Sequence, residues 1–140
     1  MKLTLEEASV IVEKTLSKAR ALKIRPLCAA VLDDGGHLKA LKREDGASIL
    51  RPQIAIGKAW GAIGMGESSR QLGQRLKDKP AFLGALSDMC AGKLVPVPGG
   101  VLILKDSIII GAVGVSGGTA DEDEACAIEG VRAAGLEFKV

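Results

Sequence analysis

The chain has 140 residues, 47% of them apolar, and a formal net charge of +2 from 19 basic and 17 acidic side chains. This length fits one domain covering residues 1–140. Mixed charges and few aromatic residues provide neither a basic patch nor a stacking surface for nucleic acid. No apolar run approaches the roughly 20 residues of a membrane span, and the acidic start lacks a signal-peptide pattern. We therefore expect a cytoplasmic protein with no nucleic-acid and no membrane partner.

The first third of the chain predicts a helix followed by a β-hairpin. Residues 4–23 carry apolar side chains at helical spacing, and Thr4 with Glu7 forms a capping box at the start. Residues 27–43 contain two apolar segments on either side of "DDGG", whose glycines supply the positive φ angles of a tight turn.

The rest of the chain predicts three helices, a second hairpin and a last helix. Residues 48–66, 67–79 and 80–92 have helical patterns, with Pro52 and Pro80 in first turns and Ser68 or Ser69 as a cap. Residues 101–115 form a hairpin of two apolar strands joined by "KDS", and Thr119 with Glu122 caps a final helix that ends near Gly135. Hairpins between covering helices predict an α+β fold with antiparallel strands.

The segment "GAVGVSGGTADEDEA" at 111–125 looks like a phosphate-binding loop before a helix, but its chemistry is wrong for one. Its glycines do not follow the G-x-G-x-x-G spacing, and G-K-[ST] is absent. Four acidic residues in the first helical turn already occupy the positive end of the helix dipole and would repel phosphate. We interpret Gly111 and Gly114 as sites of either close approach by another backbone or a β-bulge.

Four segments in series resemble the GlcG/HbpS-like family, also called the haem-degrading-domain family: "VLDDGGHLKALKREDGA", "AIGKAWGA", "KLVPVPGGVLIL" and "GAVGVSGGTADEDEA". The chain is similar to the carboxy-terminal domain of PduO proteins as well. The resemblance implies a profilin-like antiparallel five-stranded sheet with helices on both faces in α/β/α layers. It also implies a homo-oligomer and, for some members, association with haem or a corrinoid.

Four side chains are candidates for catalysis or ligand binding. His37, the single histidine, is either a polar residue beside a turn or a general base. Lys58 lies among small residues of a helix, so it either extends to solvent or meets an anion. Arg43 is either a solvated strand residue or a carboxylate ligand, and Arg51 is a further possible carboxylate ligand.

Two backbone corners could add N–H groups to such a site. Pro98, Gly99 and Gly100 form either a structural turn or a corner that faces a ligand, and Ser116, Gly117 and Gly118 form a loop with free N–H groups. We expect both corners to converge with His37 on one concave site that Lys58 enters.

The chain has no C-x-x-C-H motif, so any haem would be bound without covalent attachment. Possible axial ligands are His37, Lys58, Met65, Met89 and the cysteines Cys28, Cys90 and Cys126. A single histidine excludes a multi-histidine metal site, and we expect no metal. The cofactor stays open, with haem as one possibility.

Three functional hypotheses follow. The first is an oligomeric protein that binds a small molecule, either haem or another tetrapyrrole, or an organic acid from a catabolic pathway. The second is a cofactor-free lyase or isomerase acting on a small carboxylate, in which His37 moves a proton and Lys58 or Arg43 holds the substrate. The third is a structural module without a ligand. Whether the protein is an enzyme is left open by the sequence.

Overall fold

The computed structural model describes residues 2–140 as five helices and five strands. Their order is α1 (Leu5–Ala21), β1 (Cys28–Asp33), β2 (Leu38–Arg43), α2 (Arg51–Met65), α3 (Ser69–Leu76), α4 (Pro80–Met89), β3 (Gly100–Lys105), β4 (Ile108–Ser116), α5 (Ala120–Ala133) and β5 (Glu137–Lys139). Both predicted capping boxes are present, since Thr4 and Thr119 accept from the backbone N–H groups of Glu7 and Glu122.

The strands form one antiparallel sheet in the order β2-β1-β4-β3-β5. Both predicted hairpins are therefore correct, and β1 pairs with β4 at the centre. The register places Cys28 opposite Ser116 and Asp33 opposite Gly111. One end of the sheet therefore holds the start of β1 and the end of β4, and the other end holds the two hairpin turns.

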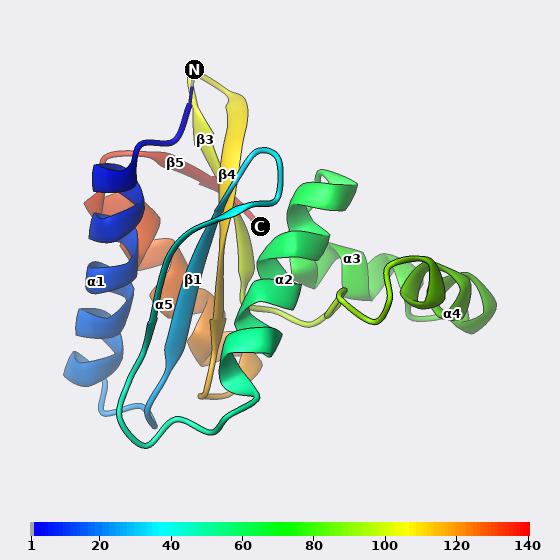
Figure 1. Ribbon diagram of the computed structural model, residues 1–140, viewed down its shortest axis with the longest axis horizontal. Helices are drawn as coiled ribbons and strands as arrows, with labels where there is room; N and C mark the ends of the chain where they lie inside the picture. The colour runs from blue at the N-terminus through cyan, green and yellow to red at the C-terminus, as the bar shows by residue number, and fades with distance from the viewer. Residues whose placement is uncertain (1) are drawn as a thin grey trace.

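Helices cover both faces of the sheet, as expected for the α+β fold with α/β/α layers (Figure 1). On one face, α1 and α5 pack together over a large core of aliphatic side chains from both helices and the central strands. On the other face, α2 lies directly against β4 and β1. A Cβ atom at Gly114 would overlap the carbonyl oxygen of Ala55, so the glycine permits this close approach.

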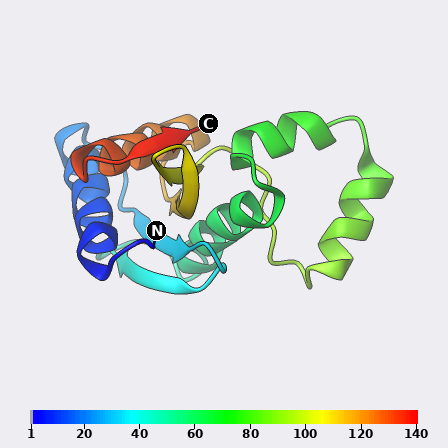
Figure 2. The ribbon, with the colours of Figure 1, turned by 90° about the horizontal axis from the view of Figure 1, so that it is seen from above.

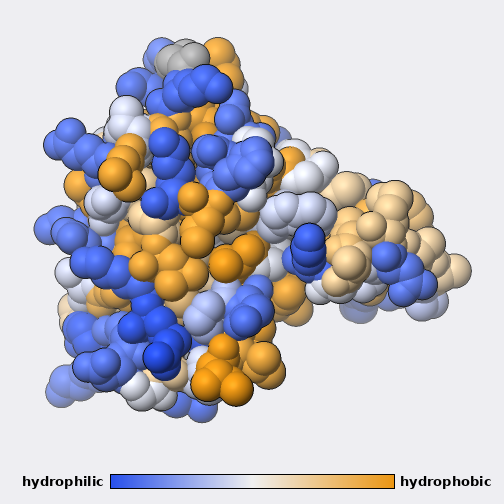
Figure 3. Space-filling model, in the orientation of Figure 1, coloured by the Kyte–Doolittle hydropathy of each residue, from blue (hydrophilic) through white to orange (hydrophobic). Residues whose placement is uncertain are grey.

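Helices α3 and α4 form an arm that extends away from the layered body (Figure 2). Ser68 begins the arm by accepting from the N–H of Gln71, as one of the two expected caps. Within the arm, Leu72, Leu76, Leu86 and Leu94 form a small separate core. The arm has a mostly apolar outer surface in the view of Figure 3. Two large apolar residues of α4, Phe82 and Met89, are exposed to solvent.

The strand β5 is a feature that the residue pattern alone did not place, because the last helix was taken to be the end of the regular structure. Glu137 and Lys139 alternate with Phe138, which packs on the core beside β3. The two-residue periodicity of "LEFKV" was the available signal. No helix within residues 2–140 has both the length and the apolar character that crossing a membrane requires; the cytoplasmic location stays a prediction.

Candidate functional site

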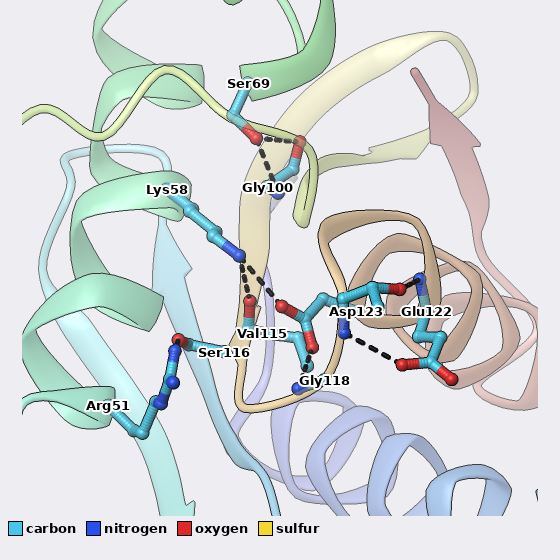
Figure 4. A network of polar contacts seen from close by, with 10 residues as sticks. Arg51, Lys58, Ser69, Gly100, Val115, Ser116, Gly118, Glu122 and Asp123 are labelled. Atoms are coloured by element: carbon cyan, nitrogen blue, oxygen red, sulfur yellow. Dashed lines mark hydrogen bonds and ion pairs between the residues drawn. The ribbon is translucent and has the colours of Figure 1, made fainter. Parts of the chain in front are cut away.

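Lys58 is held in a buried ion pair where β4 ends (Figure 4). Its Nζ donates to the carbonyl oxygen of Val115 at 2.8 Å and to Oδ2 of Asp123 at 3.0 Å. The other oxygen of Asp123 accepts from the N–H of Gly118 at 2.9 Å. The Lys58 and Asp123 side chains are only 4% and 3% exposed. This network joins α2, β4 and α5 in one place.

The corner at residues 98–100 is shaped by this lysine. A Cβ atom at Gly99 would lie 2.8 Å from Lys58 Nζ, and one at Gly100 would overlap the lysine carbonyl. Gly99 also has φ of +129°, which disfavours any side chain there. Ser69 Oγ accepts from the N–H of Gly100 at 2.7 Å. The glycines therefore give the buried lysine its space, while Pro98 is half-buried beside them.

Burial disfavours the charged forms of Lys58 and Asp123, whereas the attraction between the two side chains favours them. Burial lowers the pKa of Lys58, while the negative charge of Asp123 raises it. Burial likewise raises the pKa of Asp123, and Lys58 lowers it. Of the two alternatives for Lys58, the structure shows the anion partner, and this partner belongs to the chain itself. Lys58 therefore acts first as a link between elements.

The glycine-rich turn before α5 offers little to a phosphate. The N–H groups of Gly118 and Thr119 donate to the side chains of Asp123 and Glu122. Two donors that a phosphate would need are therefore already bound to carboxylates. The structure thus supports the interpretation of the glycines as backbone features rather than as a nucleotide loop.

Two of the three corners expected to converge lie together around the buried Lys58–Asp123 pair, and their role as a ligand site stays a prediction, whereas His37 lies elsewhere. Gly99, Gly100 and Gly118 gather around Lys58 and Asp123, and Ser116 ends β4 beside them. His37 instead follows the turn after β1, at the opposite end of the sheet. Five strand steps of about 3.3 Å separate the two ends of β1, or roughly 17 Å. Its side chain is 82% exposed and lies 3.4 Å from Asp33.

The physical reason is the direction of the strands. In an antiparallel sheet a hairpin turn lies at one end of its two strands, and their other ends lie at the opposite end of the sheet. His37 belongs to the turn between β1 and β2, whereas Ser116 lies at the opposite end. Within one chain, the lyase or isomerase hypothesis thus lacks its expected proton-transfer group, His37, beside Lys58. Arg43 lies at the same sheet end as Ser116, where it is exposed and donates to the carbonyl of Ala47 at 2.8 Å. The roles of these residues in ligand binding stay predictions.

A hollow beside Trp60 was missed by the sequence reasoning. Two adjoining cavities of about 390 and 210 Å³ share Trp60 as a common wall between α2 and the segment that leaves α4. We call them together the Trp60 groove. Ile56, Trp60 and Gly64 line it from one face of α2, and their four-residue spacing was the available signal.

The sulfur-containing side chains divide between the groove and the core. Met65, Met89 and Cys90 all line the smaller cavity of the Trp60 groove. Cys28 and Cys126 are buried elsewhere, and burial raises the pKa of both thiols to about 11. Residues 2–140 contain no cluster of three histidine, cysteine or acidic side chains that could hold a metal ion.

Comparison with known proteins places the chain in a family. The model of the family described as "Haem degrading protein HbpS-like" matches residues 3–132. The corrinoid adenosyltransferase PduO of Citrobacter freundii is 26% identical over 123 residues, which are 88% of this chain but only 36% of PduO. The chain thus spans about a third of the length of the PduO proteins it matches.

Solved structures share the fold over nearly the whole chain. The crystal structure of a PduOC:haem complex superimposes with a TM-score of 0.89, covers 100% of both chains and is 24% identical. A double mutant of HbpS from Streptomyces reticuli superimposes with a TM-score of 0.83 at 26% identity, covering 94% of this chain and 86% of that one. Together with the family match over residues 3–132, these findings show that the chain belongs to the HbpS-like family.

Proposed function

We propose that this protein binds haem in the Trp60 groove. Two findings support the ligand: the family is described by haem degradation, and a protein of the same fold has been crystallised with haem. The observation that carries the proposal is the groove itself, a largely apolar hollow with three sulfur-containing side chains at one end.

The groove suits a flat, apolar macrocycle in size and lining. Its two parts have about 390 and 210 Å³, and their combined volume falls within the range of small-molecule sites in proteins. The half-buried indole of Trp60 offers an aromatic surface along the shared wall. Lys93 lines the larger part and is exposed, so its ammonium group can pair with a propionate.

The groove also selects among the possible axial ligands. Thioether and thiolate sulfur are established ligands of haem iron, and Met65, Met89 and Cys90 are the sulfur side chains placed here. Lys58 is engaged with Asp123. His37 lines neither part of the groove, although the preceding Gly36 lies beside the Trp60 indole. The haem iron would supply ligand exchange or electron transfer, and this chain would supply the apolar walls and a sulfur donor.

A hemin titration followed by the Soret band tests the proposal. Trp60 is the only tryptophan, so its fluorescence reports binding at the groove directly. Gly64 lines the groove and has open space beside its Cα, so Gly64→Leu should fill the hollow without disturbing the fold. Gly84 lies in the middle of α4, also has open space, and provides the matched control Gly84→Leu.

We expect a saturable Soret shift and quenching of Trp60, both weakened at least tenfold by Gly64→Leu and unchanged by Gly84→Leu. Met65→Leu, Met89→Leu and Cys90→Ser identify the donor, because the loss of the axial sulfur shifts the Soret maximum. His37→Ala should leave the titration unchanged. A spectrum insensitive to Gly64→Leu and to all three sulfur variants would exclude this groove.

The homo-oligomer belongs to the same proposal. The arm of α3 and α4 projects from the body and exposes Phe82 and Met89, which a second copy could cover (Figures 1 and 2). Light scattering of the purified protein at micromolar concentration should give a mass above one chain, and Phe82→Ser should reduce it. A monomer at all concentrations would refute this part alone.

A further inference from the structure

A small basic pocket lies at the sheet end where β4 finishes and α2 begins. Its volume is about 160 Å³, and Arg25, Arg51, Ser48 and Gly117 are among its lining residues. No acidic side chain lines it. We call it the strand-end pocket; it shares no lining residue with the Trp60 groove.

The guanidinium of Arg51 is held in place. Its Nη1 donates to the Oγ of Ser116, the last residue of β4, at 3.0 Å (Figure 4). Among residues 2–140, Arg51 forms no ion pair and makes no other side-chain hydrogen bond. The remaining N–H groups of its fork are therefore available to an acceptor.

The second cation has even fewer partners. In the described part of the chain, the side chain of Arg25 makes neither a hydrogen bond nor an ion pair, although nearby Arg20 pairs with Glu44 at 2.9 Å. Helix α2 adds to the positive potential because its first turn contains no acidic residue and no side chain caps it. Two cations thus line one pocket with no anion among its lining side chains.

Gly117 contributes backbone to the wall of the strand-end pocket. Gly117 has φ of +145°, and a Cβ atom there would overlap the carbonyl oxygen of Pro26. Only glycine fits this backbone position, so Gly117 lines the pocket without a side chain of its own. The space equals that of about five water molecules, which corresponds to a ligand of roughly half a dozen non-hydrogen atoms.

We propose that the strand-end pocket binds a small dianion through the guanidinium groups of Arg25 and Arg51. The fork of a guanidinium matches the paired oxygens of a carboxylate or a phosphate. Oxalate, malonate and inorganic phosphate satisfy the size and the charge. The site is separate from the haem groove, so either proposal can fail while the other stands.

Isothermal titration at low ionic strength with oxalate, malonate and phosphate tests the pocket, and neutral oxamide tests for charge. Arg25→Gln and Arg51→Gln should each weaken binding of the dianion about tenfold or more. The exposed arginine of the arm provides the charge-matched control Arg75→Gln, which should have no more than a twofold effect. Arg25→Gln keeps the test valid if loss of the Arg51–Ser116 bond disturbs folding.

Comparison of the three anions shows which chemical class of ligand the pocket prefers. Tighter binding of oxalate and malonate identifies a small dicarboxylate, and tighter binding of phosphate identifies a phosphate group. Gly64→Leu should leave these affinities unchanged, and Arg25→Gln should leave the Soret titration unchanged. The proposal is overturned if no anion binds at millimolar concentration, if oxamide binds equally well, or if Arg75→Gln weakens binding as much as the pocket variants.

Discussion

Replacing Lys58 by methionine should cost a large part of the stability of the fold. The change keeps most of the aliphatic stem and removes the ammonium that donates to Val115 and Asp123. Charges 3.0 Å apart attract by about 5.5 kcal/mol at an effective dielectric constant of about 20. Leaving one member of a buried pair without its partner costs about 3–5 kcal/mol. A domain of this kind has about 5–15 kcal/mol in total.

Urea unfolding followed by circular dichroism measures this loss, and two further variants identify its cause. The exposed pair of Lys42 and Glu13, with side chains 58% and 59% exposed, provides the control Lys42→Met, which should cost less than about 1 kcal/mol. The double variant Lys58→Met/Asp123→Leu should be more stable than Lys58→Met, because it removes the unpaired carboxylate as well.

The loss should also depend on pH in a defined direction. Without Lys58, burial leaves the pKa of Asp123 above its unfolded value of 3.8. A raised folded pKa gives stability that is present below the unfolded pKa and is lost as pH rises through the folded pKa. Lys58→Met should therefore be more destabilised at pH 8 than at pH 4. A loss below 1 kcal/mol, or an additive double variant with no pH dependence, would refute the view of this pair as a structural link.

Two further predictions concern packing. Gly114→Ala places a methyl group on the carbonyl oxygen of Ala55 and should lower the free energy of unfolding by about 3 kcal/mol or more. The control Gly84→Ala lies in open space on a helix and should raise the free energy of unfolding by about 0.5–1 kcal/mol. Equal effects of the two variants in urea unfolding would contradict the close approach of α2 to β4. The buried hydroxyl of Thr15 has no hydrogen-bond partner among the described residues, so Thr15→Val should raise thermal stability by about 1 kcal/mol, and a lower melting temperature would show that the hydroxyl is satisfied.

The elements with strong local signals could be predicted from the sequence. Capping boxes at Thr4 and Thr119 are set by residues three positions apart, and the "DDGG" turn needs only the chain around it. Close backbone approach at Gly114 was one of the two alternatives that a glycine within an apolar strand suggests, and the structure shows it. These features depend on interactions between residues close together in the sequence, so the sequence itself predicts them.

The geometry of the site depends on contacts between residues far apart in the sequence, and these contacts were predicted only in part. Lys58 and Asp123 are 65 positions apart, so nothing local identified the carboxylate as the partner of the lysine. His37 was placed near the wrong end of the sheet, although the hairpin pattern already implied its separation from the end of β4. The four-residue spacing of Ile56, Trp60 and Gly64 marked one wall of the Trp60 groove, but the opposite wall comes from α4 and the segment after it, which no local pattern places there.

The two faces of α2 explain why binding is proposed away from the most polar part of the core. On the face toward the sheet, Lys58 forms an ion pair with Asp123, and Gly114 allows the helix to contact the strand beneath it. A ligand there would have to break a buried ion pair before it gained a contact. The opposite face, with Ile56, Trp60 and Gly64, has open space and needs no such rearrangement. A rigid inner face therefore holds the outer face in position, which is what a preformed ligand groove requires.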